Sequence, residues 1–222
     1  MSKGLFITGT GTDVGKTYVT ALIVKKLHQA GLRVGYYKAA LSGASSITDS
    51  DAGYVKRISG ISQPEEEMVS YLYRDAVSPH LAARREGNPV SFSKIRRDYG
   101  KVCEKYDYVA MEGSGGIVCP LRWDDKEQIL LADVVKKLEL AALLVTDAGL
   151  GTIHKTAVTA EYMRSHGLSV KGIVLNRYMG DEMQKDNLQM IETLSGVPVI
   201  ACMGAGEKEF PMDIEGLTGL FA

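Results

Sequence analysis

The chain has 222 residues, of which 45% are hydrophobic and 24% charged, and its formal net charge is -1 at pH 7. This is ordinary globular composition, so we expect a single domain over residues 1–222. The balanced charge excludes a broad basic surface for nucleic acid or an anionic membrane, and any anion must bind locally. No segment approaches the roughly eighteen consecutive apolar residues that cross a bilayer, and the chain begins in a strand rather than a signal peptide. We therefore expect a cytoplasmic protein.

The glycine-rich loop Gly9–Thr17 follows an apolar run, Leu5–Ile7, and precedes an apolar-periodic segment, Tyr18–His28. This order predicts a strand, a loop and a helix, with backbone N–H groups at the helix N-terminus directed toward a phosphate. Lys16 is expected to reach the β- and γ-phosphates and the Thr17 hydroxyl to ligate Mg²⁺. Thr10 stands where the strict P-loop pattern has glycine, so the motif is a variant. A tight turn that uses glycine only for backbone freedom would leave Lys16 unexplained.

A second parallel strand is predicted over residues 33–38, ending on Lys38. Ligands of open α/β sheets bind beyond the carboxyl ends of the strands, which would place Lys38 on the same rim as the P-loop. A solvated lysine at a strand end is the alternative. Residues 39–61 become small and polar, and Asp51 precedes a short helix that begins near Ala52. Asp51 is either the N-cap of that helix or a Mg²⁺ ligand, and spacing does not separate the two roles.

Residues 65–86 are less regular, with helical spacing over 81–85. His80 stands at a helix start, where a lone histidine is more often structural than catalytic. An amphipathic helix is predicted over residues 93–106 and a strand over 107–112 that ends in Glu112. A carboxylate at a strand tip beside a P-loop suits a second Mg²⁺ contact. The glycines that follow, Gly115 among them, would allow close backbone approach to a ligand or form an ordinary loop.

From residue 128 onward, helical and strand patterns alternate. Helices are expected at 129–138, 153–166 and 181–194, and strands at 141–146, 170–176 and 197–202. This predicts an α/β fold of the P-loop NTPase type, with a mostly parallel sheet covered by helices on both faces. The crossover rule puts Lys38, Glu112, Asp147 and Asn176 on one rim. The Asn176 amide could pair with an adenine edge or form a turn.

Two further parts of the chain give weaker signals. Cys103, Cys119 and Cys202 are far apart and form no Cys-x-x-Cys pair. They indicate neither a disulfide framework nor a zinc site, and we expect reduced, mostly buried thiols. The tail, residues 204–222, shows no assignable pattern.

Five motifs in chain order resemble those of dethiobiotin synthetase, the ATP-dependent cyclo-ligase of biotin synthesis. They are the variant P-loop from Gly9 to Thr17, Tyr37-Lys38 with Ser42-Gly43, Ser50-Asp51-Ala52, Ser78-Pro79-His80, and Glu112-Gly113-Ser114-Gly115-Gly116. The resemblance covers most of the chain.

The resemblance implies ATP and Mg²⁺ as cofactors, 7,8-diaminononanoate and CO2 as further substrates, and a homodimer. It implies that Lys16, Lys38, Thr12 and Ser42 act on the reacting groups, while Asp51 and Glu112 join Thr17 around the metal. It also implies nucleotide contacts from Thr12, Asp13, Val14, Gly15, Lys16, Thr17, Glu112, Gly115 and, on the adenine, Asn176. Substrate contacts are implied for Lys38 and Ser42, and for Gly151 and Thr152 across the dimer interface.

Two segments depart from the family pattern. His154 and Lys155 stand where relatives often carry Asn and His, which puts the contacts to the substrate tail in doubt. Residues 202–206 replace the usual Gly-x-Ile-Pro pattern, so base contacts from that loop cannot be assigned.

The mechanism implied by the resemblance begins with a carbamate formed from CO2 and one amine of the diamine. ATP then phosphorylates the carbamate, and the second amine closes the ureido ring. The attacking amine must first lose a proton, and the Lys38 ammonium would lower the amine pKa by repulsion.

Two other classes share parts of this pattern. Switch ATPases of the partition or cell-division type carry an additional lysine where this chain has Gly11, and they often end in a basic amphipathic helix that is not visible here. The synthetase half of a cobyrinate-type amidotransferase would need a glutaminase domain, for which we expect this chain to be too short.

Overall fold

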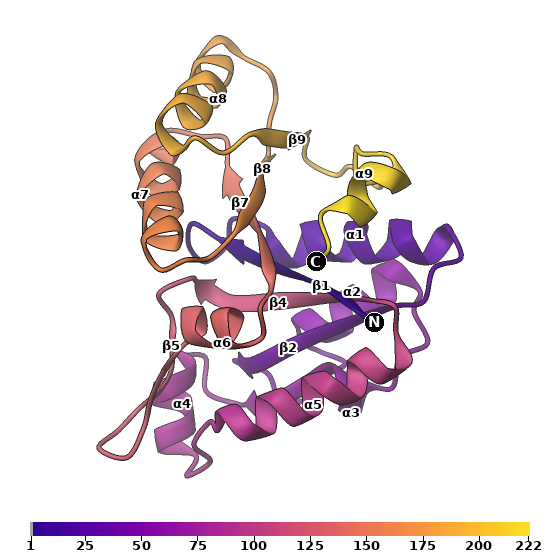
Figure 1. Ribbon diagram of the computed structural model, residues 1–222, viewed down its shortest axis with the longest axis vertical. Helices are drawn as coiled ribbons and strands as arrows, with labels where there is room; N and C mark the ends of the chain where they lie inside the picture. Colours follow the sequence, from indigo (N-terminus) through magenta and orange to yellow (C-terminus); the bar gives the residue numbers. More distant parts are fainter. Residues whose placement is uncertain (1) are drawn as a thin grey trace.

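The computed structural model describes residues 2–222 as alternating strands and helices (Figure 1). The strands are β1 (Lys3–Gly9), β2 (Val34–Ser42), β3 (Val69–Tyr73), β4 (Tyr108–Gly116), β5 (Pro120–Trp123), β6 (Gln128–Leu130), β7 (Ala141–Asp147), β8 (Val170–Asn176) and β9 (Val199–Met203). The helices are α1 (Lys16–Gln29), α2 (Asp51–Ser59), α3 (Glu65–Met68), α4 (Pro79–Arg85), α5 (Phe92–Lys105), α6 (Leu131–Lys137), α7 (Thr152–Ser165), α8 (Glu182–Ser195) and α9 (Ile214–Gly219).

Seven strands of the described chain form one sheet in the order β3-β2-β4-β1-β7-β8-β9. Every neighbouring pair in this sheet is parallel. β5 and β6 form a separate antiparallel pair. Parallel neighbours place the carboxyl ends of the strands on one rim, so the expected α/β fold with a mostly parallel sheet is confirmed.

Successive residues of each central strand point to opposite faces of the sheet, and each face has its own apolar core. On one face, Ile7 and Tyr36 pack with α1, α2 and α9. On the other face, Phe6 and Tyr37 pack with α5, α6 and part of α7, and a smaller cluster joins α7 and α8 to β7 and β8. Figure 1 shows α1 and α5 on opposite sides of the central strands. Both faces are therefore covered, as the near-continuous apolar character of these strands requires.

Two strands are longer than the sequence pattern predicted. β2 does not end at Lys38 but continues to Ser42, because its second half pairs with β3, from Lys38 opposite Val69 to Ser42 opposite Tyr73. β4 likewise continues past Glu112 to Gly116. A Cβ atom on Gly113 would lie 2.9 Å from Phe6 Cζ, so only glycine allows the strand to continue at this position without displacing its neighbours.

Other expectations for the chain were incomplete. The strands β3, β5 and β6 were not foreseen, and residues 128–130 form β6 rather than the start of a helix. In the tail, α9 packs on α1, and Ala222 exchanges backbone hydrogen bonds with Gly4 at 2.8 and 3.1 Å. The three cysteines are unpaired in the described chain and are partly buried, which agrees with the expectation of reduced thiols. No helix within residues 2–222 combines the length and the apolar character needed to cross a bilayer.

Candidate functional site

The loop between β1 and α1 holds Lys16 over its own backbone. Gly15 is the N-cap of α1 in the left-handed conformation, with φ of 95°, and Lys16 is the first helical residue. Lys16 Nζ donates to Gly11 O at 2.8 Å, and the residue is only 7% exposed. Burial lowers the pKa of Lys16, and the nearby Glu112 carboxylate opposes this effect. The lysine therefore lies across the loop, as the nucleotide-binding interpretation requires.

Side chains from the end of β8 hold this loop from the other side. Asn176 Nδ2 donates to Val14 O at 3.0 Å, and the Arg177 guanidinium donates to Asp13 O at 2.7 Å. Asn176 is buried, and a Cβ atom on Gly15 would lie 2.0 Å from its Nδ2. In this structure the amide of Asn176 fixes the P-loop backbone, which is a role that neither sequence interpretation of this residue included.

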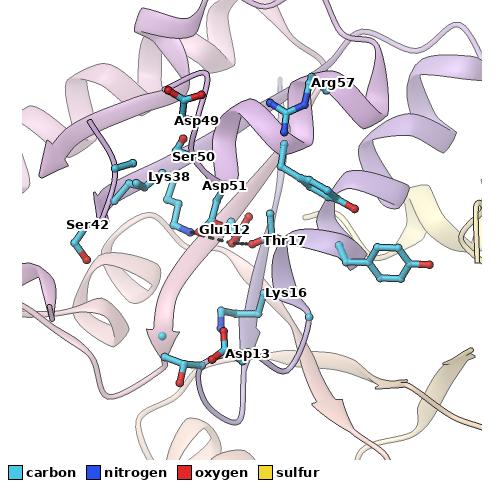
Figure 2. Close-up of a pocket in the computed structure, with 18 of the residues that line it drawn as sticks. Asp13, Lys16, Thr17, Lys38, Ser42, Asp49, Ser50, Asp51, Arg57 and Glu112 are labelled. Carbon is cyan, nitrogen blue, oxygen red and sulfur yellow. Dashed lines mark hydrogen bonds and ion pairs between the residues drawn. The ribbon is translucent and has the colours of Figure 1, made fainter. Parts of the chain in front are cut away.

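A cluster of opposite charges lies next to the P-loop and is centred on Lys38 (Figure 2). Lys38 Nζ donates to Asp51 Oδ2 at 2.6 Å and to Glu112 Oε1 at 2.9 Å. The Thr17 hydroxyl donates to the same Oε1 at 2.8 Å. The Lys38 and Glu112 side chains are 4% and 0% exposed, whereas Asp51 is 49% exposed. β2, β4, α1 and α2 each contribute one member of the cluster.

The two carboxylates decide the protonation of Lys38. Burial alone would lower its pKa, but Glu112 and Asp51 outweigh burial, and the pKa of Lys38 is raised. Burial alone would raise the Asp51 pKa, but the charge and hydrogen bond of Lys38 outweigh it, so the Asp51 pKa is lowered. Lys38 is therefore a buried cation and not the solvated lysine that the sequence left open. Asp51 is the first residue of α2 and not its N-cap, which is Ser50.

A cavity of about 630 Å³ joins the P-loop to this cluster. Its lining includes most of the predicted site residues, namely Thr12, Asp13, Gly15, Lys16, Thr17, Lys38, Ser42, Asp51, Glu112 and Gly115. Ser42 Oγ donates a hydrogen bond to Val77 O at 2.6 Å. The Val14 side chain is buried in the core, so a nucleotide contact from this residue would have to come from its backbone.

The cavity is also lined by residues that were not predicted from the sequence. They include Tyr18, Tyr54, Arg57 and Arg177. Tyr54 and Arg57 follow Asp51 at intervals of three residues on α2, so they share its helical face. Arg177 directly follows Asn176 at the end of β8. Helical spacing from Asp51 would have found the first two, but no spacing rule points to Arg177.

Other candidates lie outside this cavity. Gly151 is the left-handed N-cap of α7, and Thr152 is fully buried, with its hydroxyl bonded to Asp147 O at 2.5 Å. Asp147 also accepts from Gly149 N at 3.1 Å and therefore organises the turn before α7. His80 is at the start of α4 in a separate hollow with Arg84 and Trp123, and its Nδ1 finds no hydrogen-bond partner among the described residues.

The residues of this cavity fit a nucleotide with Mg²⁺ only if the nucleotide supplies some of the metal ligands. No group of three or more His, Cys, Asp or Glu side chains within residues 2–222 is arranged to hold a metal. The cavity offers the Thr17 hydroxyl and the neighbouring carboxylates of Asp51 and Glu112, and Asp13 and Asp49 also line it. Mg²⁺ prefers few carboxylates together with water and phosphate oxygens, which this donor set suits.

The parallel sheet, the glycine loop opening a helix and the lysine over that loop define a P-loop nucleotide-binding protein. A family model described as an AAA domain matches residues 3–207. The fold is similar to that of a ParA family ATPase from Chlorobium tepidum, with a TM-score of 0.58, 12% identity and 99% and 89% of the two chains covered. A chain of the MinC:MinD cell division protein complex of Aquifex aeolicus gives a TM-score of 0.57 at 14% identity, covering 99% and 86% of the two chains.

Curated relatives specify the family further. A protein from Brachyspira hyodysenteriae named ATP-dependent dethiobiotin synthetase is 52% identical over 90% of this chain and 91% of its own. Proteins of the same name from Clostridium botulinum and Clostridium perfringens are 47% and 45% identical, covering 91% and 98% of this chain and 91% and 97% of theirs. The chain belongs to the ATP-dependent dethiobiotin synthetase family.

Adding a methyl group to Gly15 should abolish nucleotide binding and leave the sheet folded. Gly15→Ala places a Cβ atom at a φ of 95° and 2.0 Å from Asn176 Nδ2, so the loop must move. Gly11→Ala is the control, because a Cβ atom there meets nothing within 4 Å. ADP binding by calorimetry, with circular dichroism for the fold, makes the comparison. Normal ADP binding by Gly15→Ala would contradict the described loop geometry.

The Asp51–Lys38 ion pair should make the effect of Asp51→Asn on stability depend on pH. Since the pKa of Asp51 is lowered in the folded state from 3.8, its stabilisation is present above that value and is lost as the pH falls through the folded pKa. The parent should exceed Asp51→Asn in unfolding free energy at neutral pH, and the difference should shrink below pH 3.8.

Urea unfolding over a series of pH values measures this difference. Asp49→Asn is the control, an exposed aspartate whose side chain bonds to Ser46 Oγ. The difference in unfolding free energy between the parent and Asp51→Asn should not stay constant as the pH falls. A constant difference would show that the Lys38–Asp51 ion pair does not stabilise the fold.

Proposed function

We propose that this chain converts 7,8-diaminononanoate, CO2 and ATP into dethiobiotin, ADP and phosphate in the presence of Mg²⁺. The observation that carries the proposal is the arrangement of Lys16, Thr17, Lys38, Asp51 and Glu112 around one cavity. The same chain is 52% identical to a protein named for this activity. The cavity volume of about 630 Å³ lies within the range of small-molecule sites.

The proposed chemistry needs no protein nucleophile. One deprotonated amine attacks CO2 and forms a carbamate, whose oxygen takes the γ-phosphoryl group from ATP and releases ADP. The second amine attacks the carbamoyl carbon, phosphate leaves with the C–O bond electrons, and the ureido ring closes as the amine loses its proton. The protein must hold the groups in line and stabilise negative charge on the phosphoryl oxygens.

The residues of the P-loop and the charge cluster have distinct roles in this scheme. Lys16 and Lys38 supply positive charge beside the phosphates, and Thr17, Asp51 and Glu112 would hold Mg²⁺. The metal, when bound, would neutralise charge on the phosphates. Thr12 and Ser42 line the cavity where the diamine would lie.

The charge balance of the cluster bears on the expectation that Lys38 lowers the pKa of the substrate amine. Lys38 carries one positive charge and contacts two carboxylates, so Lys38, Asp51 and Glu112 together have a net charge of about -1 without metal. The two carboxylates therefore offset the repulsion that the Lys38 ammonium would exert on a protonated substrate amine. We infer that Lys38 binds and orients the carbamate and keeps its charge throughout, since its pKa is raised.

The turn before α7 supports a homodimer with shared active sites. Leu150 is 88% exposed, and Val118 and Val158 are 52% and 54% exposed beside a second hollow that includes Gly9 and Thr10. Exposed apolar side chains around a hollow are typical of protein interfaces. We infer that the Gly149–Thr152 turn meets the substrate tail in the partner's site through the exposed backbone of Gly151, because Thr152 is buried and both its hydroxyl and its N–H are hydrogen-bonded internally.

The likeness to partition and cell-division ATPases concerns the fold alone at 12% and 14% identity. Gly11 occupies the loop position at which such proteins are expected to have a lysine, and its carbonyl here accepts the hydrogen bond of Lys16. This favours an enzyme over a switch protein.

Product formation tests the proposed activity. The parent, given ATP, Mg²⁺, bicarbonate and 7,8-diaminononanoate, should form dethiobiotin detectable by mass spectrometry. Lys16→Ala should lose at least about 100-fold of this turnover, because oriented charge at the phosphates supplies much of the rate enhancement. Lys185→Ala, an exposed lysine on α8, is the control. Phosphate release without dethiobiotin would instead favour a switch ATPase.

Complementation tests the shared site. Lys16→Ala removes the P-loop cation, and Gly151→Val distorts the α7 turn because φ there is 85°. The two inactive variants, refolded together in equal amounts, should recover roughly a quarter of parental activity, since half of the dimers are hybrids with one intact site of two. Mixtures that stay inactive, or a monomer by sedimentation, would refute the shared site.

A further inference from the structure

A buried tyrosine that does not line the cavity contacts the carboxylate of Glu112. Tyr36 lies two residues before Lys38 on β2, is 0% exposed, and packs in the core beneath α1 and α2. Its hydroxyl donates to Glu112 Oε2 at 3.0 Å. Thr17 and Lys38 both donate to the other oxygen, Oε1, at 2.8 and 2.9 Å. The two oxygens of Glu112 therefore have different partners, and Oε1 is the one shared with the cavity-lining residues.

The backbone of Tyr36 is itself fixed by a side chain. Tyr36 N donates to Gln63 Oε1 at 2.7 Å, and Gln63 Nε2 donates to Tyr36 O at 2.9 Å. β2 begins to pair with β3 only at Lys38, so the Gln63 amide takes the place of a neighbouring strand at Tyr36. Gln63 is fully buried. Both the backbone and the hydroxyl of Tyr36 are thus held in one position.

We propose that Tyr36, fixed by Gln63, is a positioning residue that sets the rotation of the Glu112 carboxylate for binding the Mg²⁺–nucleotide complex. The inference rests on the proposed function and names a residue that the reaction scheme leaves without a role. The hydroxyl anchors Oε2, so Oε1 is presented toward Thr17 and the cavity. Replacing a residue that orients a metal ligand typically costs about 10- to 100-fold in metal affinity.

A merely structural role is the alternative, because buried tyrosine hydroxyls usually have a partner. The adjacent Tyr37 provides a matched control for this alternative. It is also 0% exposed, but it faces the opposite core, and its hydroxyl is bonded to Ser70 Oγ at 2.6 Å and Ile95 O at 3.2 Å. Tyr36→Phe and Tyr37→Phe remove the same atom from neighbouring positions of one strand, and only Tyr36→Phe removes a contact to Glu112.

Calorimetric titration of ADP with and without MgCl2 separates the two roles and requires no turnover. Mg²⁺ should strengthen ADP binding to the parent and to Tyr37→Phe by the same factor. In Tyr36→Phe that gain should fall by about 10-fold, while ADP without Mg²⁺ binds as in the parent. In the turnover assay, the KM for MgATP should rise for Tyr36→Phe and the KM for the diamine should not. Equal Mg²⁺ gains in the parent and Tyr36→Phe, or the same loss in both variants, would overturn the proposal.

The result can be read separately from the proposed activity. If the parent binds MgADP but makes no dethiobiotin, the function fails while the calorimetric comparison still decides the role of Tyr36. A crystal structure of the parent with MgADP covers the case in which Tyr36→Phe does not fold. There the Tyr36 hydroxyl must remain within hydrogen-bond distance of Glu112 Oε2, and loss of that contact in the complex would contradict the inference.

Discussion

The buried ion pair between Lys38 and Glu112 is the constraint on which the candidate site depends. The two residues lie directly opposite each other in the parallel register of β2 and β4, and their side chains are 4% and 0% exposed. Removing one partner of such a pair leaves an uncompensated buried charge, so the pair strongly favours this strand register and the packing around it. Asp51 on α2 and Thr17 on α1 bond to the same pair, which ties both helices to the centre of the sheet.

The P-loop is held from two sides relative to this centre. Thr17 connects it to Glu112, and Asn176 connects it to the end of β8 through Val14 O. The cavity is therefore bounded by the fixed P-loop and by the Lys38–Glu112 pair, and both Lys16 and Lys38 line it. Preorganised charge of this kind costs no reorganisation when a phosphoryl group is transferred, which agrees with the family to which the chain belongs.

The sequence predicted the architecture well because the apolar periods of the central strands and helices are strong. It pointed to Lys16 and Thr17 through the glycine-rich loop, and to Lys38 and Glu112 because a charged residue that ends an apolar strand has few structural explanations. Asp51 was left open between a helix N-cap and a Mg²⁺ ligand. It did not predict where β2 ends, because the continuation Ala39–Ser42 is short, leads into the small and polar residues 43–46, and depends on pairing with β3, a tertiary contact. The structure of the tail was not predicted for the same reason. Helix α9 is short, and Phe210 and Phe221 are buried only because the fold packs them into the core, where Phe221 contacts Tyr108 of β4.

The roles of Tyr36, Gln63 and Arg177 were beyond any spacing rule, because each depends on which face or neighbour the fold supplies. Tyr36 and Tyr37 are adjacent and identical in type, yet one bonds to Glu112 and the other to Ser70. Only the direction of the strand pleat distinguishes them. A sequence pattern can thus indicate that two tyrosines are buried, but not which of them contacts the site.

The dependence of the site on the Lys38–Glu112 pair is tested most directly by a double-mutant cycle in unfolding free energy. Lys38→Met should cost about 3–5 kcal/mol because it leaves the Glu112 carboxylate buried beside an apolar group. Adding Glu112→Gln to Lys38→Met should restore part of that loss, so that the double variant is more stable than the sum of the two single effects. Strictly additive effects in urea unfolding would show that the two charges are not coupled and would contradict the account.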